Sequence, residues 1–324
     1  MLFITNRFPT QSIRTRANRP FDFDLRNNAA SNSVFYCEEV GAGQYQEVGS
    51  TAFLRRLKES NARQVLIYIH GFSNLPEDVF AAAREFQDLC DAGDPGEVLV
   101  VPLIWPCDND LGIVKDYWDD QESADLSAFS FARVLQRFLD WREGDQFAKD
   151  PTPCLKRINV LAHSMGNRVL RETLRLWRKY YLPGGVPLLF RNTFLIAADI
   201  VNESLEEGNA GEPITHASRN VTVYFASDDL ALRASKASNL RNRIASRRLG
   251  HSGPEDMAKV GRNVFAVDCD DVNTRYDYPK GHSYFRSGEV FGEPGVVFLH
   301  LFAALKTGRV FPEDETRRMT ILRD

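Results

Sequence analysis

Short apolar runs alternate with longer amphipathic segments through most of the chain. The runs are almost continuously hydrophobic, as expected of strands that are covered on both faces in a parallel sheet. They occupy residues 65–69, 98–104, 158–161, 193–197, 221–226 and 264–267. Apolar residues recur at helical spacing over about 76–90, 123–141, 169–177 and 295–305. The pattern predicts an α/β fold, with a mostly parallel central sheet and helices on both of its faces.

The first 60 residues follow a different pattern. Residues 2–6 and 33–38 are predicted to be short strands, and the polar segment between them is rich in Arg and Asn. We expect these strands to form an antiparallel pair at the edge of the sheet. A single domain over 1–324 is predicted, with its core at about 62–308 and the edge strands within 1–60.

The segment 107–122 follows the strand predicted at 98–104 and is polar, except for Tyr117 and Trp118. It is a candidate for a small lid over a pocket. Packing of the same two aromatic residues on the edge of the sheet is the alternative.

The overall composition is that of a globular protein, with 43% hydrophobic and 26% charged residues. A net charge of -4 provides no basic surface for nucleic acid, so that class of partner is not expected. The first residues lack the features of a signal peptide, and no stretch reaches the ~20 apolar residues of a membrane span. We therefore expect a cytoplasmic protein. The five scattered cysteines include no C-x-x-C pair, and neither disulfides, a metal nor a cofactor is predicted.

Several polar residues fall directly after the predicted strands. Right-handed crossovers place the loops that follow parallel strands along one edge of a sheet, where such folds bind ligands. His70, Ser164, Asp199, Asp229 and His282 all occupy such loops. We expect them to lie near one another.

Ser164 stands between a strand and a helix in the sequence Ala162-His163-Ser164-Met165-Gly166. A serine at such a sharp turn is held in a strained conformation, with its hydroxyl exposed above the sheet. The residues two before and two after must be small because strand and helix cross closely, and alanine here replaces the first glycine of G-x-S-x-G. Ser164 is the candidate nucleophile, and an ordinary buried turn is the alternative.

A serine hydroxyl needs a base to take its proton and an acid to orient that base. In this fold their order along the chain is Ser, acid, His. His282 follows the last predicted strand and is the candidate base, with His251 as its rival. Asp229 is the candidate acid, and Asp199 and Asp228 compete with it; all three aspartates could instead cap helices.

The oxyanion that forms on an attacked carbonyl needs preorganised hydrogen-bond donors. The candidates are the backbone N–H groups of Phe72 and Met165. Gly71 would let the backbone approach the substrate closely. His70 and His163 are expected to support the loops by hydrogen bonding.

Taken together, these motifs resemble the α/β-hydrolase superfamily. More narrowly, the chain resembles the lipase- and esterase-like hydrolases catalogued as domain of unknown function number nine hundred, over about 65–282. The resemblance implies Ser164 as nucleophile, Asp229 as acid and His282 as base. It rests on His70-Gly71-Phe72, Trp105-Pro106, Tyr117 with Asp120, the residues 162–167, Ala198-Asp199-Ile200 and the residues 229–232.

The sequence thus predicts a serine hydrolase that needs no metal. We expect it to act on a small-molecule acyl ester or lipid-like substrate, or on a thioester or amide. Two alternatives remain: an acyltransferase that uses the same triad, and a non-catalytic binding or scaffold protein with this fold.

Overall fold

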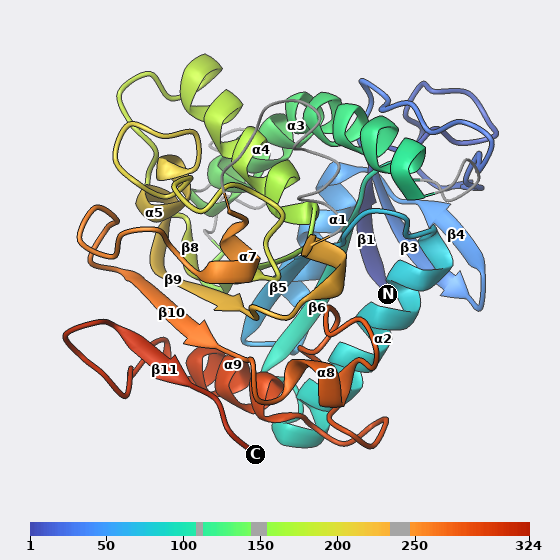
Figure 1. The fold of residues 1–324 in the computed structure, drawn as a ribbon. Coiled ribbons are helices and arrows are strands. Elements are labelled where there is room, and N and C mark those ends of the chain that lie inside the picture. The colour runs from blue at the N-terminus through green and yellow to red at the C-terminus, as the bar shows by residue number, and fades with distance from the viewer. Residues whose placement is uncertain (108–112, 144–153, 234–246) are drawn as a thin grey trace.

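The computed structural model of the chain describes residues 1–107, 113–143, 154–233 and 247–324. Within these ranges, eleven strands form one sheet in the order β11-β10-β9-β8-β7-β5-β6-β1-β3-β4-β2 (Figure 1). The strands are β1 (Leu2–Thr5), β2 (Arg19–Pro20), β3 (Phe35–Gly41), β4 (Gln44–Glu47), β5 (Gln64–Ile69), β6 (Val98–Ile104), β7 (Arg157–His163), β8 (Phe190–Ile196), β9 (Ser218–Phe225), β10 (Val264–Asp268) and β11 (Met319–Ile321).

Helices connect most of the strands. They are α1 (Ser50–Glu59), α2 (Pro76–Gly93), α3 (Ile113–Glu143), α4 (Gly166–Tyr180), α5 (Glu212–Ala217), α7 (Leu249–Ser252), α8 (Asn273–Tyr276) and α9 (Val296–Thr307). Most neighbouring strands pair in parallel, and helices contribute to an apolar core on each face of the sheet, which confirms the predicted fold class.

The strands from β11 to β1 in this order run parallel, while β3, β4 and β2 form an antiparallel edge. The expected antiparallel pair is present as β1 and β3, but it is not the outermost pair. β1 also pairs in parallel with β6, and β4 and β2 extend the sheet beyond β3. β1 is thus the strand at which the parallel sheet meets its antiparallel edge.

Two apolar cores cover the two faces of the sheet. Residues of α1, α3 and α4 belong to one core, and residues of α2 and α9 belong to the other (Figure 1). Strand β5 supplies both: Val65, Ile67 and Ile69 face the first core, whereas Leu66 and Tyr68 face the second. Burial on both faces explains why the parallel strands are continuous apolar runs in the sequence.

Helix α3 begins at Ile113, about ten residues before the predicted start at residue 123. Tyr117 and Trp118 therefore lie in its first turns and not in a loop. The acidic residues here suggested a loop, but acidic side chains near a helix N-terminus also stabilise the helix. Of the lid candidate 107–122, residues 108–112 lie outside the described ranges.

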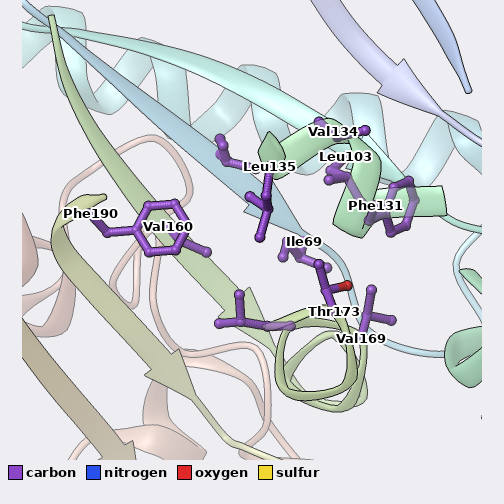
Figure 2. Close-up of a pocket in the computed structure, with 11 residues that line it drawn as sticks. Ile69, Leu103, Phe131, Val134, Leu135, Val160, Val169, Thr173 and Phe190 are labelled. Atoms are coloured by element: carbon purple, nitrogen blue, oxygen red, sulfur yellow. The ribbon is translucent and has the colours of Figure 1, made fainter. Parts of the chain in front are cut away.

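A small apolar cavity of about 20 Å³ lies between the sheet and helices α3 and α4 (Figure 2). Its walls include Ile69, Val160 and Leu135, and none of the predicted site residues lines it. Figure 2 shows the hydroxyl oxygen of Thr173 among these hydrocarbon side chains. This buried oxygen has no hydrogen-bond partner among the described residues. The cavity is a packing gap of the core.

Candidate active site

Ser164 occupies the turn between β7 and α4 with φ of 52°, in the left-handed region that few residues other than glycine adopt. Such a conformation costs about 1–3 kcal/mol and requires support from its surroundings. The Ser164 N–H donates to the carbonyl of Ile196 at 3.0 Å, and the Ser164 carbonyl accepts from the N–H of Asp199 at 3.2 Å. Asn167 adds side-chain hydrogen bonds to the carbonyls of Ala162 and Ser164, at 2.9 and 3.0 Å. The turn is thus fixed to β8 and to its own helix.

Two glycines allow the close packing around Ser164. A Cβ on Gly166 would lie 2.5 Å from the carbonyl oxygen of Ile69 and 2.6 Å from that of His70. A Cβ on Gly71 would lie 2.9 Å from the Ser164 Cβ and 3.4 Å from its Oγ. The loop that follows β5 therefore runs directly beside the Ser164 hydroxyl, as the requirement for small residues predicts.

His282 lies in the loop between α8 and α9, and its imidazole is hydrogen-bonded with Asp229. The distance from His282 Nδ1 to Asp229 Oδ2 is 2.6 Å. Asp229 is fully buried after β9, and its Oδ1 accepts the N–H of Leu232 at 2.9 Å. Asp277 Oδ2 accepts the backbone N–H groups of both His282 and Ser283 at 2.8 Å, which fixes the loop that carries the imidazole.

The charge on His282 is set by opposing effects. Burial disfavours the imidazolium, but the adjacent Asp229 carboxylate, assisted by Asp199 and Asp277, outweighs it. The pKa of His282 is therefore raised above its ordinary value of 6.5. Because Asp229 accepts a hydrogen bond at Nδ1, the neutral ring carries its proton there and leaves Nε2 free to act as a base.

The other two histidines of the site are neutral and engaged in hydrogen bonds. Burial lowers the pKa of His70 to about 3, and the nearby Arg7 acts in the same direction. His70 Nδ1 bonds the Gly71 carbonyl at 2.8 Å, and its Nε2 accepts the Trp105 N–H at 3.2 Å. Both nitrogens of His70 are thus used to hold the loop after β5.

His163 connects the serine turn to the histidine loop. Burial, together with the nearby His282, lowers its pKa well below 6.5. Its Nε2 donates to the His282 carbonyl at 3.1 Å, and the two imidazole rings are 4.8 Å apart. Since His163 directly precedes Ser164, this contact places the histidine loop beside the serine turn. Within the described residues, no hydrogen bond joins the Ser164 hydroxyl itself to His282.

The backbone N–H groups of Phe72 and Met165 donate to no acceptor in the described part of the chain. Met165 is nevertheless fully buried, a position where an unpaired N–H is rare. The loop that carries Phe72 is held firmly: Asn74 Nδ2 donates to the carbonyls of Gly71 and Phe72 at 3.1 and 2.7 Å. The buried Asp120 carboxylate accepts the Ser73 N–H at 2.9 Å.

The competing aspartates form interactions with other groups. Asp199 accepts the Tyr117 hydroxyl at 2.8 Å and forms a buried ion pair with Arg248, 3.1 Å from its Nε. Asp228 accepts the side-chain amide of Asn273 at 2.6 Å. His251 lies in the short helix α7, on the segment that follows Arg248. None of the three has a hydrogen bond to the His282 ring among the described residues.

Sequence reasoning missed Asp277 as the residue that fixes the histidine loop. The only available signal was its position five residues before the candidate base, and aspartate is common in loops.

Among the described residues, no group of three or more His, Cys, Asp and Glu side chains is arranged to hold a metal ion. No helix in the same ranges is long and apolar enough to cross a bilayer.

A strained serine between a buried parallel strand and a helix, with a bonded His–Asp pair at the same edge of the sheet, is characteristic of α/β hydrolases. The chain belongs to the family described as alpha/beta hydrolase of unknown function (DUF900), whose sequence pattern matches residues 46–289. This match confirms the resemblance seen in the sequence.

No curated protein matches the sequence significantly. One solved structure with some likeness is a lipase-esterase related protein from Clostridium acetobutylicum, which is 9% identical. The match covers 70% of this chain and 89% of that chain, with a TM-score of 0.28. This likeness is too distant to carry a functional argument.

Proposed function

We propose that this protein is a serine hydrolase that cleaves a carboxylic ester, or a related thioester or amide, through an acyl-enzyme on Ser164. The observation that carries the proposal is the 2.6 Å hydrogen bond between His282 Nδ1 and the buried Asp229 carboxylate. This bond leaves the second nitrogen of the imidazole available as a base in the loop next to the serine turn.

In the first step, Ser164 Oγ attacks the acyl carbon while His282 Nε2 accepts the hydroxyl proton. The Asp229 carboxylate stabilises the resulting imidazolium and holds the ring in the correct tautomer. The tetrahedral intermediate then collapses, the bond to the leaving group breaks, and Nε2 donates its proton to the departing oxygen. The acyl group remains esterified to Ser164.

In the second step, a water molecule replaces the leaving group and gives its proton to Nε2 as it attacks the acyl carbon. Collapse of this second intermediate returns the proton to Ser164 Oγ and releases the acid. The backbone N–H groups of Phe72 and Met165, which donate to no acceptor among the described residues, would donate to the oxyanion in both steps. Removing one such donor typically slows catalysis by about 10²–10³-fold.

Labelling with a fluorophosphonate, which reacts with activated serines, tests the proposal. We expect the folded protein to be labelled, the Ser164→Ala variant not to be labelled, and the Ser283→Ala variant to be labelled normally. Ser283 is a suitable control because it neighbours His282 and its hydroxyl makes no hydrogen bond within the described residues. Absence of label on folded wild-type protein would instead support a non-catalytic scaffold.

A panel of nitrophenyl esters of graded acyl length provides the turnover assay. We expect Ser164→Ala and His282→Ala to lower kcat by roughly 10⁴-fold or more. Near-normal turnover by either variant would remove that residue from the proposed mechanism. Adding an alcohol or amine separates hydrolysis from acyl transfer, because only transfer yields the new ester or amide.

A further inference from the structure

A second hollow, of about 430 Å³, lies at the antiparallel edge of the sheet, formed by residues other than those of the hydrolase site. Its walls come from the polar loop before β2, from β3, from the start of α1 and from the middle of α3. In Figure 1 the dark blue N-terminal loops lie beside α3, and Ser130 Oγ donates to the Ser31 carbonyl at 2.9 Å. The volume is within the range of about 300–1,000 Å³ usual for small-molecule sites.

Three arginines line this hollow: Arg16 from the N-terminal loop, and Arg133 and Arg137 from α3. None of them forms an ion pair among the described residues, although one nitrogen of Arg133 donates to the Asn32 carbonyl and to Ser130 Oγ. The one carboxylate in the wall, Glu47, is already neutralised, since it accepts Arg19 Nε at 2.7 Å and the Arg16 backbone N–H at 3.0 Å. The hollow therefore carries an uncompensated positive charge.

The hydroxyl of Tyr36 adds a neutral donor to the wall. The side chain is only 8% exposed and packs against Phe53, yet its hydroxyl has no hydrogen-bond partner in the described part of the chain. Burial raises the pKa of Tyr36 to about 12, while the charges of Arg137 and Arg133, which line the same hollow, act in the opposite direction. The oxygen is not among the buried atoms that lack a partner, so it faces the hollow's solvent, where it can donate to a ligand.

Helix α1 begins in the same hollow. Gly49 and Ser50 line it, the helix has no side-chain cap, and its first turn contains no acidic residue. The first N–H groups of a helix have no partner within the helix, and they attract anions together with the helix dipole. The positive end of α1 thus reinforces the field of the arginines.

From this arrangement we propose that the hollow binds the phosphate group of a small water-soluble molecule, through Arg16, Arg133, Arg137 and the Tyr36 hydroxyl. Arginine presents paired N–H donors that match the oxygens of phosphate, and a multiply charged tetrahedral anion can use donors from several directions. The site is independent of the proposed hydrolase chemistry, because it shares no residue with it. Tyr117, beside Phe72, is 16 residues from Arg133 along α3, which corresponds to about 24 Å of helix.

Titration calorimetry with inorganic phosphate and with pyrophosphate, at constant ionic strength set by sodium chloride, tests this proposal. We expect saturable binding of one anion per chain, tighter for pyrophosphate. The Arg133→Ala/Arg137→Ala variant should bind about 100-fold more weakly, and Tyr36→Phe about fivefold more weakly. Arg262→Ala, which removes an exposed arginine before β10, is the matched control and should bind as the wild type does.

Circular dichroism establishes that each variant is folded, and the exposed positions of Arg133 and Arg137 favour this. Absence of saturable binding by wild-type protein below about 10 mM would overturn the proposal. Equal weakening by Arg262→Ala would overturn it too, since it would indicate general charge attraction. Binding to phosphatidic acid vesicles without binding of free phosphate would assign the arginines to a membrane surface and would also overturn it.

Discussion

Gly166→Ala tests how closely the strand that leads to the oxyanion loop packs against the helix that follows Ser164. Gly166 is the first residue of α4, and even in a helix interior alanine gains only about 0.5–1 kcal/mol over glycine. Here the added Cβ would lie 2.5 Å from the Ile69 carbonyl oxygen and 2.6 Å from that of His70. Both contacts are with backbone atoms, which cannot rotate away as a flexible side chain can.

The expected magnitude follows from these distances. A carbon atom and a carbonyl oxygen need more than 3 Å, so the end of β5 and the start of α4 must separate by roughly 0.5–1 Å. Overpacking of this kind costs about 1–3 kcal/mol, which outweighs the helix preference. The displaced segment leads directly into Gly71 and Phe72, and a shift of about 1 Å at a site can cost 10²-fold in rate.

We therefore expect Gly166→Ala to lower the free energy of unfolding by about 1–3 kcal/mol and kcat/KM by about 10²-fold. Urea unfolding measures the first quantity and nitrophenyl ester hydrolysis the second. Gly184→Ala is the control, because that exposed glycine has an ordinary φ and no atom within 4 Å of the added Cβ. Unchanged stability and activity of Gly166→Ala would refute the proposed close crossing.

Three further predictions follow from the structure. Asp229→Asn should lower kcat in ester turnover by about 10⁴-fold, as loss of the acid does in serine proteases. Asp199→Asn should instead lower the free energy of unfolding in urea by about 3–5 kcal/mol, because it breaks the buried ion pair with Arg248. The reverse pattern in the two measurements would exchange the roles of the two aspartates. Because the pKa of His282 is raised and its neutral form is the base, kcat/KM should fall as the pH decreases, with a midpoint above pH 6.5. A pH profile of kcat/KM whose acidic midpoint lies below 6.5 would contradict this. Thr173→Val should raise the free energy of unfolding by about 1 kcal/mol, because it removes a buried hydroxyl that has no partner among the described residues; a loss of stability would imply such a partner.

Much of the fold could be predicted because the parallel strands are buried on both faces. The run from Val98 to Ile104 coincides with β6, and Pro76 marks the start of α2. The strands β2, β4 and β11 were missed: β2 and β11 contain two and three residues, and β4 is the polar sequence Gln-Tyr-Gln-Glu without an apolar run. Their pairing depends on neighbouring strands far away in the sequence, and no local pattern contains that information.

The local sequence is sufficient to place the candidate nucleophile: Ser164 lies between an apolar run and a helix, with small residues at the crossing. It also placed Asp199, Asp228 and Asp229 after parallel strands, where each satisfies the required order along the chain. Which of these carboxylates meets the His282 ring is visible only in the folded chain, where Asp229 is the hydrogen-bonded one. The His282 loop is held by hydrogen bonds to Asp277, 5 residues away in the chain, and to His163, 119 residues away. Tertiary packing, and not spacing in the sequence, therefore sets the distance between His282 and each aspartate.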